Sequence, residues 1–149
     1  MIRVKNIGDM AFEATGPSGL PIVMDSSPKF GGQDKGPRPM EVLLMAAAGC
    51  TGMDVVSLMK KMRVEYSHFW IDVDADRASE HPKIYTRIDM VFNVVAKEED
   101  RPKIEKAVRL SQERYCAASV HLKALAELSW RVVIHETLPE KERWQETSM

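Results

Sequence analysis

A long apolar stretch between residues 39 and 63 constrains this chain more than any other feature of its sequence. Pro39 suits the first turn of a helix, where its missing N–H has no intrahelical partner. The run from Val42 to Cys50 has no polar face. We therefore expect a helix over residues 39–63 that is buried on every side rather than docked by one stripe.

Six shorter apolar segments predict strands. Three near the start of the chain are separated by turns that contain Gly or Pro, which indicates a small antiparallel meander. Two in the middle alternate polar and apolar side chains with period two, which predicts a half-buried hairpin. The order of strands and helices indicates an α+β fold. The expected strands are residues 2–4, 10–14, 20–24, 68–76, 84–96 and 128–134.

A second helix is expected after the hairpin, and it leads to Cys116. The acidic residues 98–100 suit the positive N-terminal end of its dipole, and Pro102 suits its first turn. After Cys116 the chain either continues as helix or starts a new one through Leu125. The expected apolar side of the second helix consists of Ile104, Val108, Ser111 and Tyr115.

Length and composition favour one soluble domain over residues 1–138 with a polar tail over residues 139–149. The formal net charge of −1 gives no electrostatic case for nucleic acid or an anionic membrane surface, both of which need a basic patch. The longest wholly apolar run is short of the roughly 18 residues of a membrane span, and no signal peptide is visible. We expect a cytoplasmic protein without a nucleic-acid or membrane partner.

The chain has two cysteines, Cys50 and Cys116. Cytoplasmic thiols are normally kept reduced, so a purely structural disulfide is a poor expectation. Small residues flank both cysteines, which suits either a redox thiol with room beside it or an inert thiol in a tight helix crossing. If the two helices meet, the thiols form an attacking and resolving pair. The residues alone leave both interpretations open.

The surroundings of Cys50 in the sequence offer no activation of its thiol. Asp54 lies one helical turn further on, and its negative charge disfavours a thiolate. Arg38 lies about 18 Å away along the helix. A cation must therefore come from elsewhere in the fold or from a partner chain. The four histidines show no metal-ligand spacing, so no metal site is expected.

Residues 36–51, together with Tyr115, Cys116 and Ala117, resemble the superfamily of osmotically inducible protein C and organic hydroperoxide resistance proteins (OsmC/Ohr). The most specific part is the run Pro-x-Glu-x-x-x-x-Ala-x-x-Gly-Cys, which ends at Cys50. Residues 48–57 and 110–116 are most similar to the YhfA-like subgroup. The resemblance implies an intertwined α+β homodimer with antiparallel sheets around two long central Cys-bearing helices. A second copy would also cover the apolar helix.

The resemblance also implies a cysteine-based hydroperoxide reductase that serves in oxidative-stress defence. Cys50 would attack an organic hydroperoxide or hydrogen peroxide and become a sulfenic acid. Cys116 would then form a redox-active disulfide with Cys50. An external dithiol such as a lipoyl group would reduce this disulfide, and no metal or other cofactor is implied.

Two further residues are supporting candidates on the same pattern. Family reductases carry a Glu directly after the Pro, where this chain has Met40, so Glu41 is the nearest carboxylate. Lys29 stands where one branch has an Arg, and it offers a point charge rather than a planar fork. The alternative interpretation is a non-enzymatic or weakly redox-active homodimer that binds a small apolar ligand at its interface.

Overall fold

The structure, a computed structural model, describes residues 1–142, so residues 143–149 of the expected tail lie outside the described residues. The chain divides into two compact units, Met1–Ala46 and Ala47–Met149. The start of the expected tail contains a short 3-10 turn, η4, over Glu140–Glu142. The expected single domain over residues 1–138 stays a prediction.

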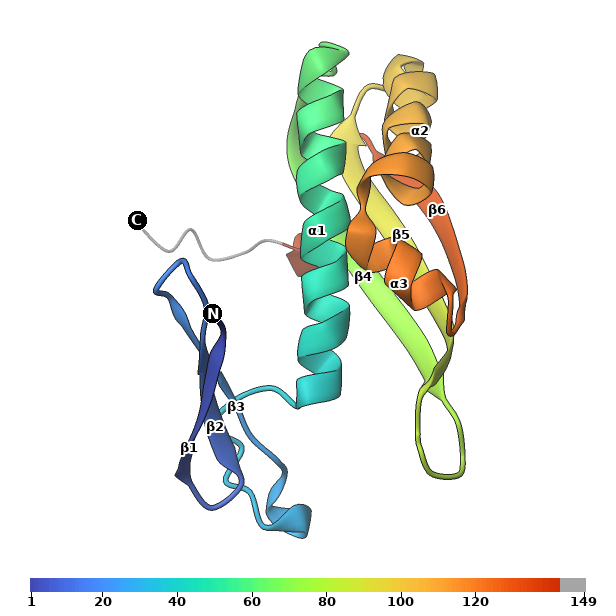
Figure 1. The fold of residues 1–149 in the computed structure, drawn as a ribbon. Helices are drawn as coiled ribbons and strands as arrows, with labels where there is room; N and C mark the ends of the chain where they lie inside the picture. The colour runs from blue at the N-terminus through green and yellow to red at the C-terminus, as the bar shows by residue number, and fades with distance from the viewer. Residues whose placement is uncertain (143–149) are drawn as a thin grey trace. The chain divides into compact units, whose positions relative to one another are not determined.

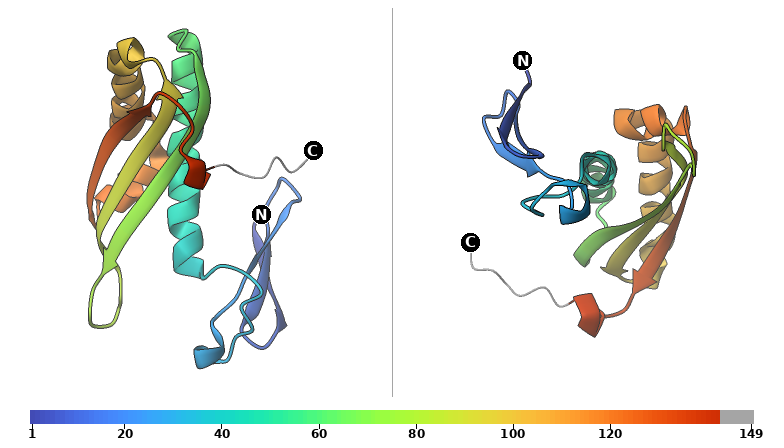
Figure 2. Two further views of the ribbon diagram at one scale, coloured as in Figure 1. Left: turned by 180° about the vertical axis from the view of Figure 1, so that it is seen from behind. Right: turned by 90° about the horizontal axis from the view of Figure 1, so that it is seen from below.

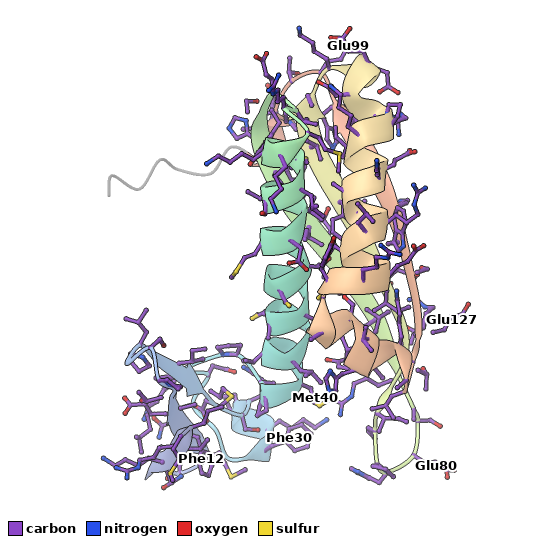
Figure 3. The ribbon with its side chains drawn as sticks, turned by 45° about the horizontal axis from the view of Figure 1, so that its top comes forward. Phe12, Phe30, Met40, Glu80, Glu99 and Glu127 are labelled. Carbon is purple, nitrogen blue, oxygen red and sulfur yellow. The ribbon has the colours of Figure 1, made fainter. Side chains whose placement is uncertain are left out.

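The first unit contains the predicted antiparallel meander (Figure 1). Its strands β1, β2 and β3 pair in sequence order, and a 3-10 turn, η1, follows them. Phe12 and Phe30 of this unit are exposed (Figure 3). The elements are β1 (Arg3–Gly8), β2 (Ala11–Thr15), β3 (Pro21–Met24) and η1 (Pro28–Phe30).

A buried carboxylate organises the loop between β3 and the long helix. The side chain of Asp25 is 2% exposed and accepts hydrogen bonds from the backbone N–H groups of Ser26, Gln33 and Lys35. These bonds, that of Lys35 first, lower the pKa of Asp25. The loop is thereby tied to the end of β3.

The helix α1 (Pro39–Lys61) begins at the predicted proline. Its buried residues form one stripe with a four-residue repeat, and Met53 on another side is 74% exposed. The expectation of burial on every side is therefore wrong for the single chain, because apolar composition does not supply a second covering layer. By length and composition alone α1 could cross a membrane, but core helices of soluble proteins can be equally long and apolar. The buried residues are Ala47, Thr51, Gly52, Val55 and Met59.

The second unit is built on a three-stranded sheet in the order β4-β5-β6. The strands β4 (Tyr66–Arg77) and β5 (Tyr85–Ala96) form the predicted antiparallel hairpin, whose turn carries Glu80 (Figure 3). The strand β6 (Glu127–His135) pairs in parallel with β5. This sheet is mixed, which corrects the expected antiparallel arrangement. The reason is the helical crossover between β5 and β6, which returns the chain to the starting end of β5.

Helices lie on one face of this sheet (Figure 2). The part of α1 within this unit packs on β4, since a Cβ at Gly52 would lie 3.3 Å from Cδ1 of Ile71. The helix α2 (Arg101–Leu110) follows the acidic 3-10 turn η2 (Glu98–Asp100). Fully buried side chains from β5, α1 and α2 form the core between these layers: Ile88, Met90, Phe92, Val55, Met59, Ile104 and Val108.

A turn of π-helix, η3 (Ser111–Tyr115), follows α2 without a break. It changes which residues face the core, because a π turn holds one residue more than an α turn. Tyr115 is 57% exposed, so its predicted place on the apolar side is wrong, whereas Gln112 and Cys116 are buried. A new helix, α3 (Ala117–Lys123), starts directly after Cys116.

Candidate functional site

The structure brings the two cysteines together within the second unit. Cys50 lies in α1 and is partly exposed, whereas Cys116 lies at the junction of η3 and α3 and is fully buried. Both thiols are free, and the Cys116 thiol is the largest influence on the pKa of Cys50, which places the two side chains close to each other. The helices therefore meet as an attacking and resolving pair requires.

The sulfur of Cys116 occupies the N-cap position of α3. It accepts hydrogen bonds from the backbone N–H of Ser119 at 3.4 Å and from the Ser119 hydroxyl at 3.2 Å. Side chains at this position usually accept with oxygen, so a sulfur here replaces a stronger acceptor. The Cys116 sulfur therefore accepts two hydrogen bonds from one residue, Ser119.

The electrostatic surroundings of Cys50 disfavour its thiolate. Its pKa is raised, mainly by the hydrogen bond with the Cys116 thiol and further by desolvation and by the negative charge of Asp54. The backbone N–H of Ala118 acts in the opposite direction. None of these groups is a cation. The main influences on the pKa of Cys50 therefore include no positive charge that would stabilise its thiolate.

A buried network of polar side chains surrounds Cys116. The amide nitrogen of Gln112 donates to the hydroxyl oxygen of Thr51 at 2.9 Å and to that of Ser119 at 3.2 Å. The Thr51 hydroxyl lies 2.8 Å from the Ser111 hydroxyl, which donates to the Asp54 carboxylate at 3.1 Å. The network therefore links the Cys116 sulfur to a carboxylate on α1.

Sequence patterns did not identify Gln112 and Ser119 as site residues. Gln112 is displaced into the core by the π turn, which leaves no mark in the spacing of apolar residues. Ser119 is one of several small residues after Cys116 and carries no distinctive spacing. The only available signal was the sequence Leu-Ser-Gln-Glu-Arg-Tyr-Cys over residues 110–116, which pointed to a subgroup and not to a role.

The two supporting candidates, Glu41 and Lys29, lie in the first unit. The Glu41 carboxylate accepts the backbone N–H of Arg38 at 2.8 Å, at the start of α1. The Lys29 ammonium lies 5.7 Å from the centre of the Phe30 ring. Met40 lies beside Glu41 in the first turn of α1 (Figure 3). A role for Glu41 or Lys29 at Cys50 stays a prediction.

The arrangement suits thiol–disulfide chemistry rather than metal chemistry. Within residues 1–142 no three His, Cys, Asp or Glu side chains are grouped so that they could hold a metal ion. Two free thiols in contact need only lose two hydrogens to form a disulfide. The partly exposed thiol can meet an oxidant or a reductant, and the buried thiol can react with its neighbour.

Comparison with known proteins gives consistent similarities. The family of OsmC-like proteins matches residues 32–131. Protein YhfA of Escherichia coli (strain K12) is 33% identical over 127 residues, which cover 85% of this chain and 92% of YhfA. A hypothetical protein from Aquifex aeolicus VF5 has a similar crystal structure, with 30% identity, a TM-score of 0.73, and coverage of 91% of this chain and 97% of that chain. The organic hydroperoxide resistance protein OhrB of Bacillus subtilis shares the fold, with 18% identity, a TM-score of 0.60, and coverage of 89% and 96%.

Proposed function

The chain belongs to the family of OsmC-like proteins, and from this premise we propose that it is a thiol-dependent peroxidase for organic hydroperoxides. The observation that carries the proposal is the contact between Cys50, which is partly exposed, and Cys116, which is buried. Proteins of similar fold are named organic hydroperoxide resistance proteins, which supports the choice of oxidant.

The reaction oxidises the two thiols and reduces the O–O bond. The Cys50 sulfur attacks the outer hydroperoxide oxygen, the O–O bond breaks, and the alkoxide takes a proton and leaves as an alcohol. Cys50 is then a sulfenic acid. The Cys116 sulfur attacks the Cys50 sulfur, the S–O bond breaks, and hydroxide takes a proton and leaves as water. An external dithiol, such as a lipoyl group, returns both sulfurs to thiols and becomes a disulfide.

The raised pKa of Cys50 means that the single unit leaves its nucleophile mostly protonated at neutral pH. We propose that a homodimer completes the site, with Lys29 and Glu41 as the supporting charged residues. Exposed apolar side chains along α1, namely Leu43, Met45 and Met53, favour a second copy as their cover. The proposed setting is the cytoplasm, where small dithiols are available as reductants.

The test is steady-state consumption of cumene hydroperoxide with dihydrolipoamide as the reductant. Wild-type protein should turn over, Cys50→Ser should be inactive, and Cys116→Ser should complete one turnover and then stop or become overoxidised. Consumption by Cys50→Ser at the wild-type rate would refute the assignment of the nucleophile. Sedimentation at micromolar concentration tests the dimer, and a stable monomer would remove it.

One observation favours the alternative interpretation as a ligand-binding protein. The first unit contains a cavity of about 430 Å³ whose lining is mainly apolar and includes Val4, Met10, Phe12 and Met24. A cavity of this size suits a small apolar molecule. Native mass spectrometry that finds a ligand retained by Cys50→Ser, together with no hydroperoxide consumption by the wild type, would favour binding over catalysis.

A further inference from the structure

Gln112 is an unusual residue for the core of this unit. It is 1% exposed, and its side-chain oxygen is buried without a hydrogen-bond partner within residues 1–142. A buried polar atom without a partner costs about 1–3 kcal/mol. An apolar side chain would avoid this cost, so the position needs an explanation beyond packing.

The side-chain nitrogen of Gln112 sets the direction of two hydrogen-bond chains. An amide nitrogen only donates, so Ser119 and Thr51 must each accept from it with their hydroxyl oxygens. The hydroxyl hydrogen of Ser119 is then free for its neighbour at 3.2 Å, the Cys116 sulfur. The opposite orientation of the amide would leave two buried N–H donors without partners instead of one oxygen. This favours the orientation in which the nitrogen faces Thr51 and Ser119.

The second chain runs away from the cysteines. Thr51, having accepted from Gln112, donates to Ser111, and Ser111 donates to the Asp54 carboxylate. A carboxylate is a pure acceptor, so it fixes this end of the chain. One amide group therefore directs protons toward two acceptors, the carboxylate of Asp54 and the sulfur of Cys116.

We propose that Gln112 is a positioning residue for Cys116, and that its amide nitrogen holds the Ser119 hydroxyl so that the hydroxyl hydrogen points at the Cys116 sulfur and favours its thiolate. The backbone N–H of Ser119 supplies the second donor. Hydrogen bonds from two donors to one sulfur stabilise a thiolate more than a thiol.

The inference deepens the proposed function, on which its catalytic meaning rests, by assigning the leaving group of the reductive step. A reductant thiolate attacks the partly exposed Cys50 sulfur, the Cys50–Cys116 bond breaks, and its electron pair goes to the Cys116 sulfur. A stabilised thiolate leaves faster. The reductant is thereby joined to Cys50 in a mixed disulfide, which its second thiol resolves, and Cys116 returns to its two donors.

Few other charged groups are placed to compete with these hydrogen bonds. Asp54 and Cys50 are the titratable groups of α1 on this side. Lys123 of α3 donates to the backbone oxygen of Gln112 at 2.7 Å. The titratable residues of η3 and the remaining one of α3 have exposed side chains: Glu113, Arg114, Tyr115 and His121.

The test follows the ultraviolet absorbance of the Cys116 thiolate against pH in the full chain carrying Cys50→Ser, so that only one thiol titrates. Gln112→Met keeps the volume but removes the donor, and the ratio of thiolate to thiol at a given pH should fall about tenfold, as for one lost hydrogen bond to a charged group. Ser119→Ala should lower the ratio similarly. The double variant should fall little further, because both changes act through one hydroxyl.

Two variants separate positioning from general disturbance. Thr51→Val removes the other hydroxyl that Gln112 holds, and it should lower stability while leaving the titration unchanged. Gln112→Leu is a second apolar replacement without a donor, so it should lower the ratio even where Gln112→Met fails to fold. An unchanged ratio in Gln112→Met or Gln112→Leu, or fully additive effects with Ser119→Ala, would overturn the proposal. The titration uses no hydroperoxide, so its result does not depend on whether the peroxidase assay succeeds or fails.

Discussion

The negative charge of Asp54 is a brake on Cys50 that a single substitution should release. Asp54 lies one helical turn after Cys50, and its charge raises the pKa of the Cys50 thiol. Asp54→Asn removes the charge but keeps an oxygen that can accept the Ser111 hydroxyl, which lies 3.1 Å from the carboxylate. The pKa of Cys50 should therefore fall, and its thiolate should be more abundant at neutral pH.

The size of the effect follows from the separation of the two side chains. Residues four apart on a helix have Cβ atoms about 6 Å apart, and two unit charges at that distance interact by about 0.7 kcal/mol in a water-like dielectric. A water-like dielectric is the appropriate choice, because the charge of Asp54 is the smallest of the effects on the pKa of Cys50. The reactivity of Cys50 should rise about threefold, since 1.4 kcal/mol corresponds to a factor of ten.

The assay is the rate of alkylation of reduced protein by iodoacetamide at neutral pH, resolved by peptide mass spectrometry so that Cys50 and Cys116 are counted separately. Glu65→Gln is a matched control, because it removes the same charge from an exposed side chain beyond the end of α1. The gain in Asp54→Asn should shrink as salt screens the charge. A rate for Cys50 equal to or below that of the control would refute the electrostatic argument.

Three smaller predictions concern the fold around the site. Met59→Ala should cost about 2–5 kcal/mol of unfolding free energy in urea titrations, because its side chain is fully buried. Met53→Ala, whose side chain is exposed in the single chain, should cost at most about 0.5 kcal/mol where the protein is dilute enough to be a monomer, and more where the proposed second copy covers it. Gly49→Ala should stabilise the monomer by about 0.5–1 kcal/mol, since a Cβ there meets open space in the single chain, but it should weaken the proposed dimer, because Gly49 lies on the same face of α1 as Met45 and Met53. Arg87 lowers the pKa of Asp74 in the folded protein. The ion pair of Arg87 and Asp74 therefore contributes to stability above the pKa of Asp74 in the unfolded chain, and this contribution is lost as the pH falls through the lower pKa of the folded protein. Arg87→Ala should therefore make the loss of stability in acid shallower.

The elements that the sequence predicted well are those whose signals are local. Pro39 marks the first residue of α1, and the period-two alternation over residues 68–76 and 84–96 predicted the hairpin. Cysteine chemistry was predictable in kind, since two thiols amid small residues suit a redox pair. Their contact was not, because it depends on how segments 66 positions apart pack against each other.

The parts that the sequence did not predict depend on register and on layers. One extra residue in the turn over residues 111–115 exposes Tyr115 and buries Gln112, and apolar spacing cannot signal such an insertion. The parallel pairing of β6 follows from the crossover before it, while its own side-chain pattern suits either direction. The exposed sides of α1 show that apolar sequence predicts a need for cover but does not identify the cover.

The proposed function requires that Cys50 and Cys116 form a redox pair driven by hydroperoxide. Its most direct test is the intact mass of the reduced protein after one equivalent of cumene hydroperoxide, followed by peptide mapping. The expected result is the loss of two hydrogens, a disulfide between Cys50 and Cys116, and no such loss in Cys50→Ser or Cys116→Ser. An unchanged mass with both thiols still free, while the hydroperoxide persists, would contradict it.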